Sequence, residues 1–273
     1  MDNGSLRPEA GLMTRRISNM LQQEIGLPVI AASLAHSDRI PEESLGGISI
    51  PLLDELLERL CERADFKEIW IVPFLLVTGG MIYQRIQATL KRFSLRYPQL
   101  SFDITDGLVS ESDPLEESIA GLIAEQVHDL IDREKLLRPR LVMVDHGSPD
   151  PSSARVRNHV SERLASILGD KVDGVVPASM ERREGPEYDF NEPLLERALV
   201  ESVEQGHLNI VLARLFLQPG RHNGRGGDVD CVCDSVTGQF PETRILSLPR
   251  IFSEKRLVPL LKRRLKQLSK IET

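Results

Sequence analysis

Residues 140–151 read RLVMVDHGSPDP, an apolar run followed by a polar turn. The run from Arg140 to Asp145 has the length and composition of a buried strand. Gly147 permits a tight turn after it, and Ser148 or Ser152 is able to cap a following helix. The amphipathic stretch that comes next completes a strand, a loop and a helix, which together form the repeating unit of an α/β fold.

Strand-length apolar runs alternate with helix-length amphipathic stretches over the whole chain. This alternation indicates mostly parallel sheets covered by helices on both faces. The predicted fold class is therefore α/β, with two tandem, doubly wound, mostly parallel-sheet domains related by an internal repeat. The other predicted strands are Pro28–Leu34, Glu68–Leu76, Ser101–Thr105, Val172–Ser179, Asn209–Leu217 and Thr243–Leu248.

The repeat is visible because the turn that begins at Asp145 recurs at the start of the chain. Residues 2–8 read DNGSLRP, and residues 145–151 read DHGSPDP. Aligning the two turns places Asn3 in the position of His146. The two copies therefore share a turn but differ in the one residue that is able to bind a metal or accept a proton.

Spacings further along the chain support the duplication. The distance from Pro51 to Phe74 equals that from Pro193 to Phe216, and the apolar runs that follow also keep step. Matched spacing over such lengths is typical of tandem copies of one unit. The predicted domains are 1–135 and 140–273.

The first copy differs from the second in what precedes its turn. A whole strand, Arg140–Asp145, leads into the second turn, whereas only Met1 stands before Asp2. Two interpretations remain open at this point. Either the chain as given begins late relative to the repeat, or the first copy has lost an edge of its sheet.

Composition narrows the class of protein. Of the 273 residues, 41% are hydrophobic and 27% charged, which is typical of globular domains, and the net charge of −7 argues against general nucleic-acid binding. The longest apolar stretch, Ile69 to Val77, is too short to span a membrane, and there are three cysteines. We predict a cytoplasmic protein, monomeric or homodimeric, with no membrane or nucleic-acid partner.

Three candidate site residues follow predicted strands of the second copy. His146 comes directly after one strand, His222 follows the strand that begins at Asn209, and Glu181 follows the strand that ends at Ser179. The carboxyl ends of parallel strands meet at one edge of a sheet, where ligands bind. Imidazole coordinates first-row metals and accepts a proton near neutral pH, and a carboxylate does both as well.

Other residues gave weaker signals. A histidine after a strand is often a hydrogen-bonded loop residue, so His146 or His222 alone would be weak evidence, whereas the pair favours a site. His36 follows a strand of the first copy and is an alternative ligand or substrate contact. The pair Cys231 and Cys233 lacks two further ligands at a fitting spacing, so we predict no thiolate metal site there.

The combination of these motifs with the duplication resembles the sirohydrochlorin chelatases of the CbiX/SirB type, in the class II chelatase superfamily. The matching residues are His146-Gly147-Ser148 and the segment LFLQPGRH at 215–222. The resemblance covers the whole chain, more strongly in the second copy. It implies a long form with a degenerate first half.

The resemblance implies insertion of a divalent metal (cobalt, ferrous iron or nickel) into sirohydrochlorin or a related anionic tetrapyrrole, without ATP or another cofactor. The pathway would be that of cobalamin or sirohaem. In the family two histidines bind the metal and help to remove the pyrrole protons, and these roles fall to His146 and His222, with Glu181 as an acidic partner. Arg221, Arg182 and Ser148 are the expected contacts to the tetrapyrrole.

The first copy departs from the family pattern, since Asn3 replaces the first histidine and Gly80 or Met81 stands where His222 stands in the second copy. We therefore predict one active site per chain, in the second copy. Two other functions remain open. One is a non-catalytic metal or tetrapyrrole carrier that uses the same histidines, and the other is a small-molecule-binding or regulatory α/β protein in which they are structural.

Overall fold

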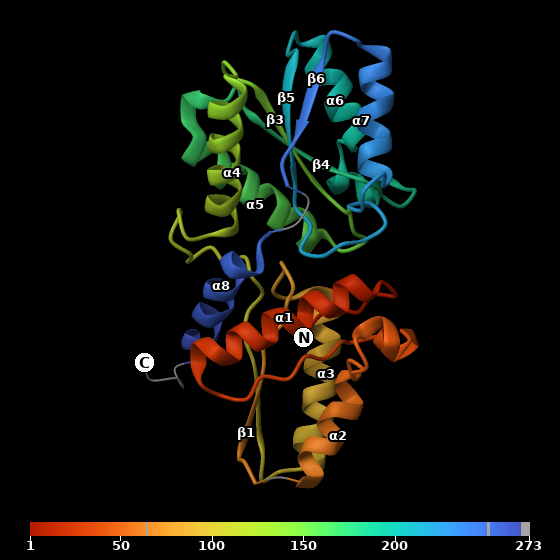
Figure 1. Cartoon of the computed structure of the whole chain (residues 1–273), viewed down its shortest axis with the longest axis vertical. Coiled ribbons are helices and arrows are strands. Elements are labelled where there is room, and N and C mark those ends of the chain that lie inside the picture. The colour runs from red at the N-terminus through yellow and green to blue at the C-terminus, as the bar shows by residue number, and fades with distance from the viewer. Residues whose placement is uncertain (64, 250–251, 269–273) are drawn as a thin grey trace. The chain divides into compact units, whose positions relative to one another are not determined.

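The chain forms two units in the computed structural model, which describes residues 1–63, 65–249 and 252–268 (Figure 1). Unit 1 consists of Met1–Ser110 and Phe252–Thr273, and unit 2 consists of Glu111–Ile251. Each unit is an α/β structure with its own apolar core. The predicted α/β class with parallel sheets is confirmed.

Unit 2 contains a fully parallel sheet of four strands in the order β4-β3-β5-β6. Helices α4 and α5 cover one face and α6 and α7 the other (Figure 1). The strands are β3 (Arg140–Asp145), β4 (Val175–Ser179), β5 (Asn209–Arg214) and β6 (Arg244–Ser247). The helices are α4 (Ile119–Glu134), α5 (Pro151–Leu168), α6 (Leu195–Glu204) and α7 (Asp228–Gln239), with 3-10 turns at Gly169–Lys171 and Pro186–Asn191.

The central strands of unit 2 are apolar on both faces because helices cover both. Val142 and Val144 of β3 pack toward α6 and α7, where Leu199 and Val236 lie in the same core cluster. The alternate residue Met143 is also fully buried. Such continuous apolar runs are typical of parallel strands, and they hold the carboxyl ends of β3 and β5 rigidly side by side.

In unit 1, α1, α2 and α3 follow one another as α5, α6 and α7 do in unit 2, but the sheet is smaller and consists of β1 and β2, which pair in parallel. Its core cluster includes Leu57, Ile71, Ile86 and Phe93. The strands are β1 (Glu68–Ile71) and β2 (Ser101–Ile104). The helices are α1 (Pro8–Ile25), α2 (Leu53–Arg63), α3 (Gly80–Arg96) and α8 (Glu254–Gln267), with 3-10 turns at Ser37–Arg39 and Glu42–Leu45.

One predicted strand does not form. The segment Pro28–Leu34 makes only isolated bridges, from Ser33 to Asp2 and to Leu52. Its counterpart in unit 2 is β4, which pairs along its length with β3. The segment lacks that partner, because only Met1 and Asp2 stand where β3 stands in unit 2.

The hydrogen-bond register also corrects one detail of the predicted alignment of the two copies. Phe74 donates its N–H to the carbonyl of Met1, and Leu215 donates its own to the carbonyl of Val144. Met1 and Val144 hold the same position before the repeated turn. Phe74 therefore corresponds to Leu215 rather than to Phe216.

The units as packed do not follow the sequence copies. Helix α4 lies at the end of the first copy but packs on α5 in unit 2, and α8 lies at the end of the second copy but packs on α1 in unit 1. Each unit therefore contains the last helix of the other copy. The boundaries 1–135 and 140–273 stay a prediction about the repeat in the sequence.

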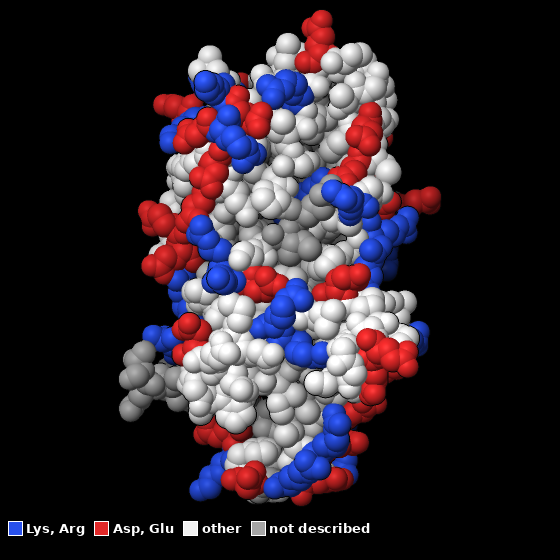
Figure 2. Space-filling view, in the orientation of Figure 1, with Lys and Arg blue, Asp and Glu red and all other residues white. Residues whose placement is uncertain are grey.

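The distribution of surface charge and the character of the helices are relevant to nucleic-acid and membrane partners. Acidic and basic side chains are interspersed over the visible face (Figure 2), and the whole chain carries a net charge of −7. In the described part of the chain, no helix combines the length and the apolar character that crossing a membrane requires.

Candidate functional site

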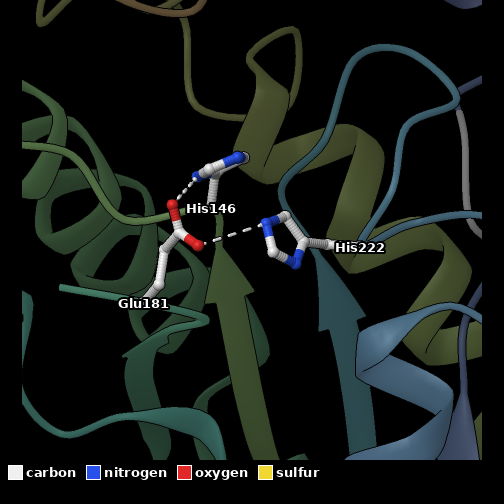
Figure 3. A group of neighbouring side chains, drawn as sticks. All are labelled: His146, Glu181 and His222. Atoms are coloured by element: carbon white, nitrogen blue, oxygen red, sulfur yellow. Dashed lines mark ion pairs between the residues drawn. The ribbon is translucent and has the colours of Figure 1, made fainter.

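His146, Glu181 and His222 come together at the carboxyl edge of the sheet of unit 2 (Figure 3). His146 is the first residue after β3, Glu181 follows the end of β4, and His222 lies in the loop after β5. Because these three strands are neighbours and parallel, their ends deliver the three side chains to one place.

The donor atoms of the three side chains all lie within 4.8 Å of one another. Glu181 stands between the rings, with its Oε1 3.5 Å from His146 Nδ1 and its Oε2 3.6 Å from His222 Nε2. The ring centroids are 4.4 Å apart, and the rings are perpendicular. Two donors that share one ion at about 2.1 Å each lie no more than about 4.2 Å apart, so small side-chain rotations would bring all three onto one metal ion.

The two histidines differ in environment. The side chain of His146 is 58% exposed, whereas that of His222 is 8% exposed. Burial lowers the pKa of His222 below its ordinary 6.5, and the positive charge on a protonated His146 lowers it further, while Glu181 and Asp228 oppose the shift. The buried ring is therefore neutral at pH 7, with a lone pair available for a metal or a proton.

Asp228, at the start of α7, contacts the other side of the His222 ring, with its Oδ2 2.8 Å from His222 Nδ1. The contact is close, but its geometry is not that of a well-aligned hydrogen bond. A carboxylate at Nδ1 favours the tautomer whose Nε2 carries the lone pair. His222 Nε2 is the atom that faces Glu181.

The turn that presents His146 is built around the buried carboxylate of Asp145. Its Oδ1 accepts hydrogen bonds from the N–H of Gly147 at 3.1 Å and from the hydroxyl of Ser179 at 2.6 Å. Gly147 has a φ of 84°, and a Cβ there would lie 1.9 Å from the carbonyl oxygen of Glu181. Only glycine fits this position, and the close approach brings the His146 and Glu181 backbones together.

Two further buried residues hold the loops of the site. Arg157, 1% exposed, donates from Nη1 to the hydroxyl of Ser179, and its Nη2 donates to the carbonyl of Phe190 at 2.9 Å. Asn191, fully buried, accepts from the N–H of Ser148 at 3.1 Å and donates to its carbonyl at 2.9 Å. Asn191 therefore links the turn after β3 to the loop after β4, and Arg157 attaches that loop and the end of β4 to α5.

The three residues predicted to contact the tetrapyrrole differ in the contacts that they make within the protein. Ser148 uses its Oγ to accept from the N–H of Asp150 at 3.0 Å, and so shapes the turn. Arg182 pairs with Asp189 at 2.7 Å and Glu192 at 2.9 Å, so its guanidinium already holds the loop after β4. Arg221 has an 80% exposed side chain and forms an ion pair with Asp228 at 3.1 Å.

The first copy keeps the turn but not the site. Asp2 accepts from the N–H of Gly4 at 3.0 Å and from the hydroxyl of Ser33 at 2.6 Å, as Asp145 does from Gly147 and Ser179. A Cβ on Gly4 would meet the carbonyl oxygen of Ala35, so Ala35 stands where Glu181 stands. With Asn3 in the place of His146 and Ala35 in the place of Glu181, two of the three candidate metal ligands have no counterpart in the first copy.

His36 lies in unit 1, exposed, with a φ of 68°. Within the residues that the structure describes, the cluster of His146, Glu181 and His222 is the only group of its kind, and it does not include His36, Cys231 or Cys233. The two cysteines lie on α7, Cys233 buried and Cys231 exposed.

Sequence reasoning found the three clustered residues and missed Asp145, Arg157, Asn191 and Asp228. The sequence did contain a signal for Asp145. The equivalent turn of the first copy also has an aspartate, Asp2, which indicates that both copies need this residue to form the turn. Arg157 and Asn191 act through contacts across 22 and 43 positions of the chain, which local patterns do not reveal.

Comparison with known proteins places this geometry in a family context. The CbiX family model matches residues 1–125 and 140–268. Search of curated proteins gave no match.

Among solved structures, the chain is similar to SirB from Bacillus subtilis with Fe3+, at 14% identity and a TM-score of 0.70, covering 99% of this chain and 96% of that one. SirB from Bacillus subtilis subspecies spizizenii in complex with cobalt matches at 15% identity and a TM-score of 0.66, covering 99% and 95%. CbiX described as the terminal enzyme of sirohaem biosynthesis in denitrifying bacteria matches at 17% identity and a TM-score of 0.50, covering 94% and 91%. At these identities the structural likeness establishes a shared fold.

Proposed function

Because the chain belongs to the CbiX family, we propose that it inserts a divalent metal ion into sirohydrochlorin or a related anionic tetrapyrrole. The observation that carries the proposal is the meeting of two imidazoles and one carboxylate, within 4.8 Å, at the carboxyl edge of the sheet of unit 2. The metal ion and the tetrapyrrole are both substrates.

The reaction exchanges one metal dication for two pyrrole protons, so the site has to hold a cation and accept protons in the same place. His222 suits the first task, because its ring is neutral at pH 7 and Asp228 orients its Nε2 toward Glu181. Glu181 suits the second, because its exposed carboxylate lies between both rings. We assign to His146, which is also exposed, the coordination of the incoming ion and the transfer of a proton to solvent.

The anionic tetrapyrrole requires cationic contacts near the three ligands. Arg221 is adjacent to His222 and 80% exposed, so its guanidinium can turn from Asp228 to a substrate carboxylate in a paired hydrogen bond. Arg182 is held by two carboxylates, so we assign it the support of the loop that carries Glu181. Ser148 likewise supports the turn that carries His146.

We propose cobalt or ferrous iron as the metal. A mixed imidazole and carboxylate set suits first-row divalent ions in general. The two SirB structures that the chain resembles contain Fe3+ and cobalt, respectively.

The test is an insertion assay with metal-free sirohydrochlorin and either Co2+ or Fe2+, followed by the change in the absorption spectrum of the macrocycle. The wild-type chain should accelerate metallation over the protein-free rate. His146→Ala should slow the catalysed reaction by at least about 100-fold, because both a ligand and a proton acceptor are removed. Asn3→Ala is the matched control, since Asn3 holds the same position in the first copy, and it should leave the rate unchanged.

The same assay separates the proposal from a metal or tetrapyrrole carrier with the same site. A carrier would bind Co2+ and sirohydrochlorin but leave the rate of metallation at its protein-free value. Equal rates for the wild-type chain and His146→Ala would reject the assignment of the site. Unchanged Co2+ binding after the loss of either histidine would favour a structural role for both.

A further inference from the structure

The first turn of α7 makes three contacts with the loop that carries His222. The carboxylate of Asp228 lies 2.8 Å from His222 Nδ1, and the N–H of Val229 donates to the carbonyl of His222 at 3.3 Å. Asp230 Oδ2 accepts from the N–H of Gly226, in the same loop, at 2.8 Å. The position of the His222 ring therefore depends on the position of this turn.

Arg214, the last residue of β5, attaches the same turn to the sheet. Its Nη2 donates to Asp230 Oδ1 at 2.6 Å and to the hydroxyl of Ser247, at the end of β6, at 3.2 Å. The side chain of Arg214 is 1% exposed and that of Asp230 is 17% exposed. Asp230 thus uses one carboxylate oxygen for the guanidinium and the other for the loop that carries His222.

The packing of α7 on the sheet does not require this ion pair. Val229, Cys233 and Val236 already bury one face of the helix in the apolar core of unit 2. A buried ion pair is weak evidence for stability, because taking two charges out of water can cost as much free energy as their attraction returns. In the described part of the chain, Arg214 Nε and Nη1 have no hydrogen-bond partner, which adds to the cost of burying the guanidinium.

The first copy forms the equivalent strand and helix without the ion pair. The hydrogen-bond register of the two copies places Pro73 in the position of Arg214. Helix α3, which follows, begins with the uncharged sequence Gly-Met-Ile at 80–82, whereas α7 begins with Asp-Val-Asp at 228–230. At these described positions, the ion pair occurs in the copy that has His222 and not in the other copy.

We infer that Arg214 and Asp230 are positioning residues for the metal ligand His222. They fix the first turn of α7 to the end of β5 and so keep His222 Nε2 directed toward Glu181. The inference rests on the proposed role of His222 in binding the metal ion, and neither positioning residue is assigned a contact with that ion or with the tetrapyrrole. A displaced turn would move Asp228 away from Nδ1, and a histidine ligand that loses its outer carboxylate binds metal more weakly.

The test replaces both members of the pair at once, because the loss of one would leave a buried charge without its partner. Arg214→Met/Asp230→Leu introduces apolar side chains of similar shape, so the midpoint of thermal unfolding should stay within about 3 °C of the wild-type value. The Kd for Co2+, measured by isothermal titration well below that midpoint, should rise at least about tenfold. Asp234→Asn is the matched control, since Asp234 is exposed on the next turn of α7, and it should change neither value.

A second comparison changes Arg214 alone. Arg214→Lys keeps a cation beside Asp230 and should leave the Kd for Co2+ within about threefold of the wild-type value, whereas the neutral Arg214→Gln should raise it at least about tenfold.

The metal-free chain gives an independent readout, since long-range 15N–1H NMR spectra distinguish the two tautomers of the His222 ring. The tautomer with its proton on Nδ1 should predominate in the wild-type chain, because the Asp228 carboxylate lies beside that nitrogen. It should lose that predominance in Arg214→Gln and in the double variant.

Two results would overturn the inference. One is an unchanged tautomer ratio in the double variant and in Arg214→Gln. The other is an equal Kd for Co2+ in Arg214→Lys and Arg214→Gln, since the charge of the pair would then have no effect on the ligand. The proposed function can fail separately, because it is judged by metal insertion, whereas the tautomer ratio requires neither a metal ion nor a tetrapyrrole.

Discussion

At the scale of single residues, the electrostatics of His222 can be measured directly. Burial and the charge of His146 lower the pKa of His222, and the carboxylates of Glu181 and Asp228 raise it. Titration of the imidazole signals by NMR should therefore give His222 a pKa below 6.5.

Variants should move that pKa in opposite directions. His146→Ala removes a neighbouring positive charge and should raise the pKa of His222, whereas Asp228→Asn removes a negative charge and should lower it. Asp228→Asn should also weaken Co2+ binding at pH 7.5 by about 10-fold or more, because the ring loses its orientation while staying neutral. A shift of the same sign in both variants would contradict the described arrangement of charges.

Gly147 should be the least replaceable residue of the turn. Its positive φ would strain an alanine by about 1–2 kcal/mol, and the added Cβ would lie 1.9 Å from the carbonyl oxygen of Glu181. Gly147→Ala should lower the free energy of unfolding, measured by denaturant titration, by more than about 2 kcal/mol. Gly220→Ala is the control, because a Cβ there meets nothing within 4 Å, and an equal loss in both variants would contradict this account.

The residues that were predictable are those with chemistry of their own at the end of a strand. His146, Glu181 and His222 stand out because a reactive side chain directly after an apolar run points to the ligand-binding edge of a parallel sheet. Asp145, Arg157 and Asn191 support that edge through hydrogen bonds to residues distant in the sequence. Because such polar residues are also common on protein surfaces, the residue type alone does not reveal this role. Only the folded chain shows which partners they find.

At the scale of elements, the strands of the second copy were predictable because helices bury them on both faces and their sequences are continuously apolar. The segment Pro28–Leu34 has the same composition but forms no strand, since strand formation depends on a partner in the ladder. Residues 228–234 show the opposite case. Polar and apolar residues alternate there as in a half-buried strand, but these residues lie in α7.

The assignment of α7 makes a chemical prediction. Cys231 is exposed and Cys233 is buried, and burial raises the pKa of the Cys233 thiol to about 11. Cys61 is also buried with a raised pKa. Iodoacetamide at pH 8 should therefore alkylate the native chain once, at Cys231, because the thiolate is the reactive form. Mass spectrometry that finds rapid modification of Cys233 would contradict the burial of that face.

At the scale of the whole chain, the same fold occurs in two copies, and only the second copy carries the three candidate metal ligands. The duplication was predictable from matched turns and spacings, because both copies need the same aspartate and glycine. The packing of α4 in unit 2 and of α8 in unit 1 was not predictable, because the sequence of an amphipathic helix does not indicate which sheet the helix covers. Isothermal titration with Co2+ should accordingly find one site per chain, and two equal sites would contradict the prediction that only the second copy binds the metal.

The most direct test of the central claim is cobalt X-ray absorption on the Co2+-loaded chain. The claim is that His146, His222 and Glu181 bind one metal ion. The spectrum of the wild-type chain should show scattering from two imidazoles and at least one carboxylate oxygen, and His222→Ala should lose one imidazole. A wild-type spectrum without imidazole scattering, or one that His222→Ala leaves unchanged, would contradict the claim.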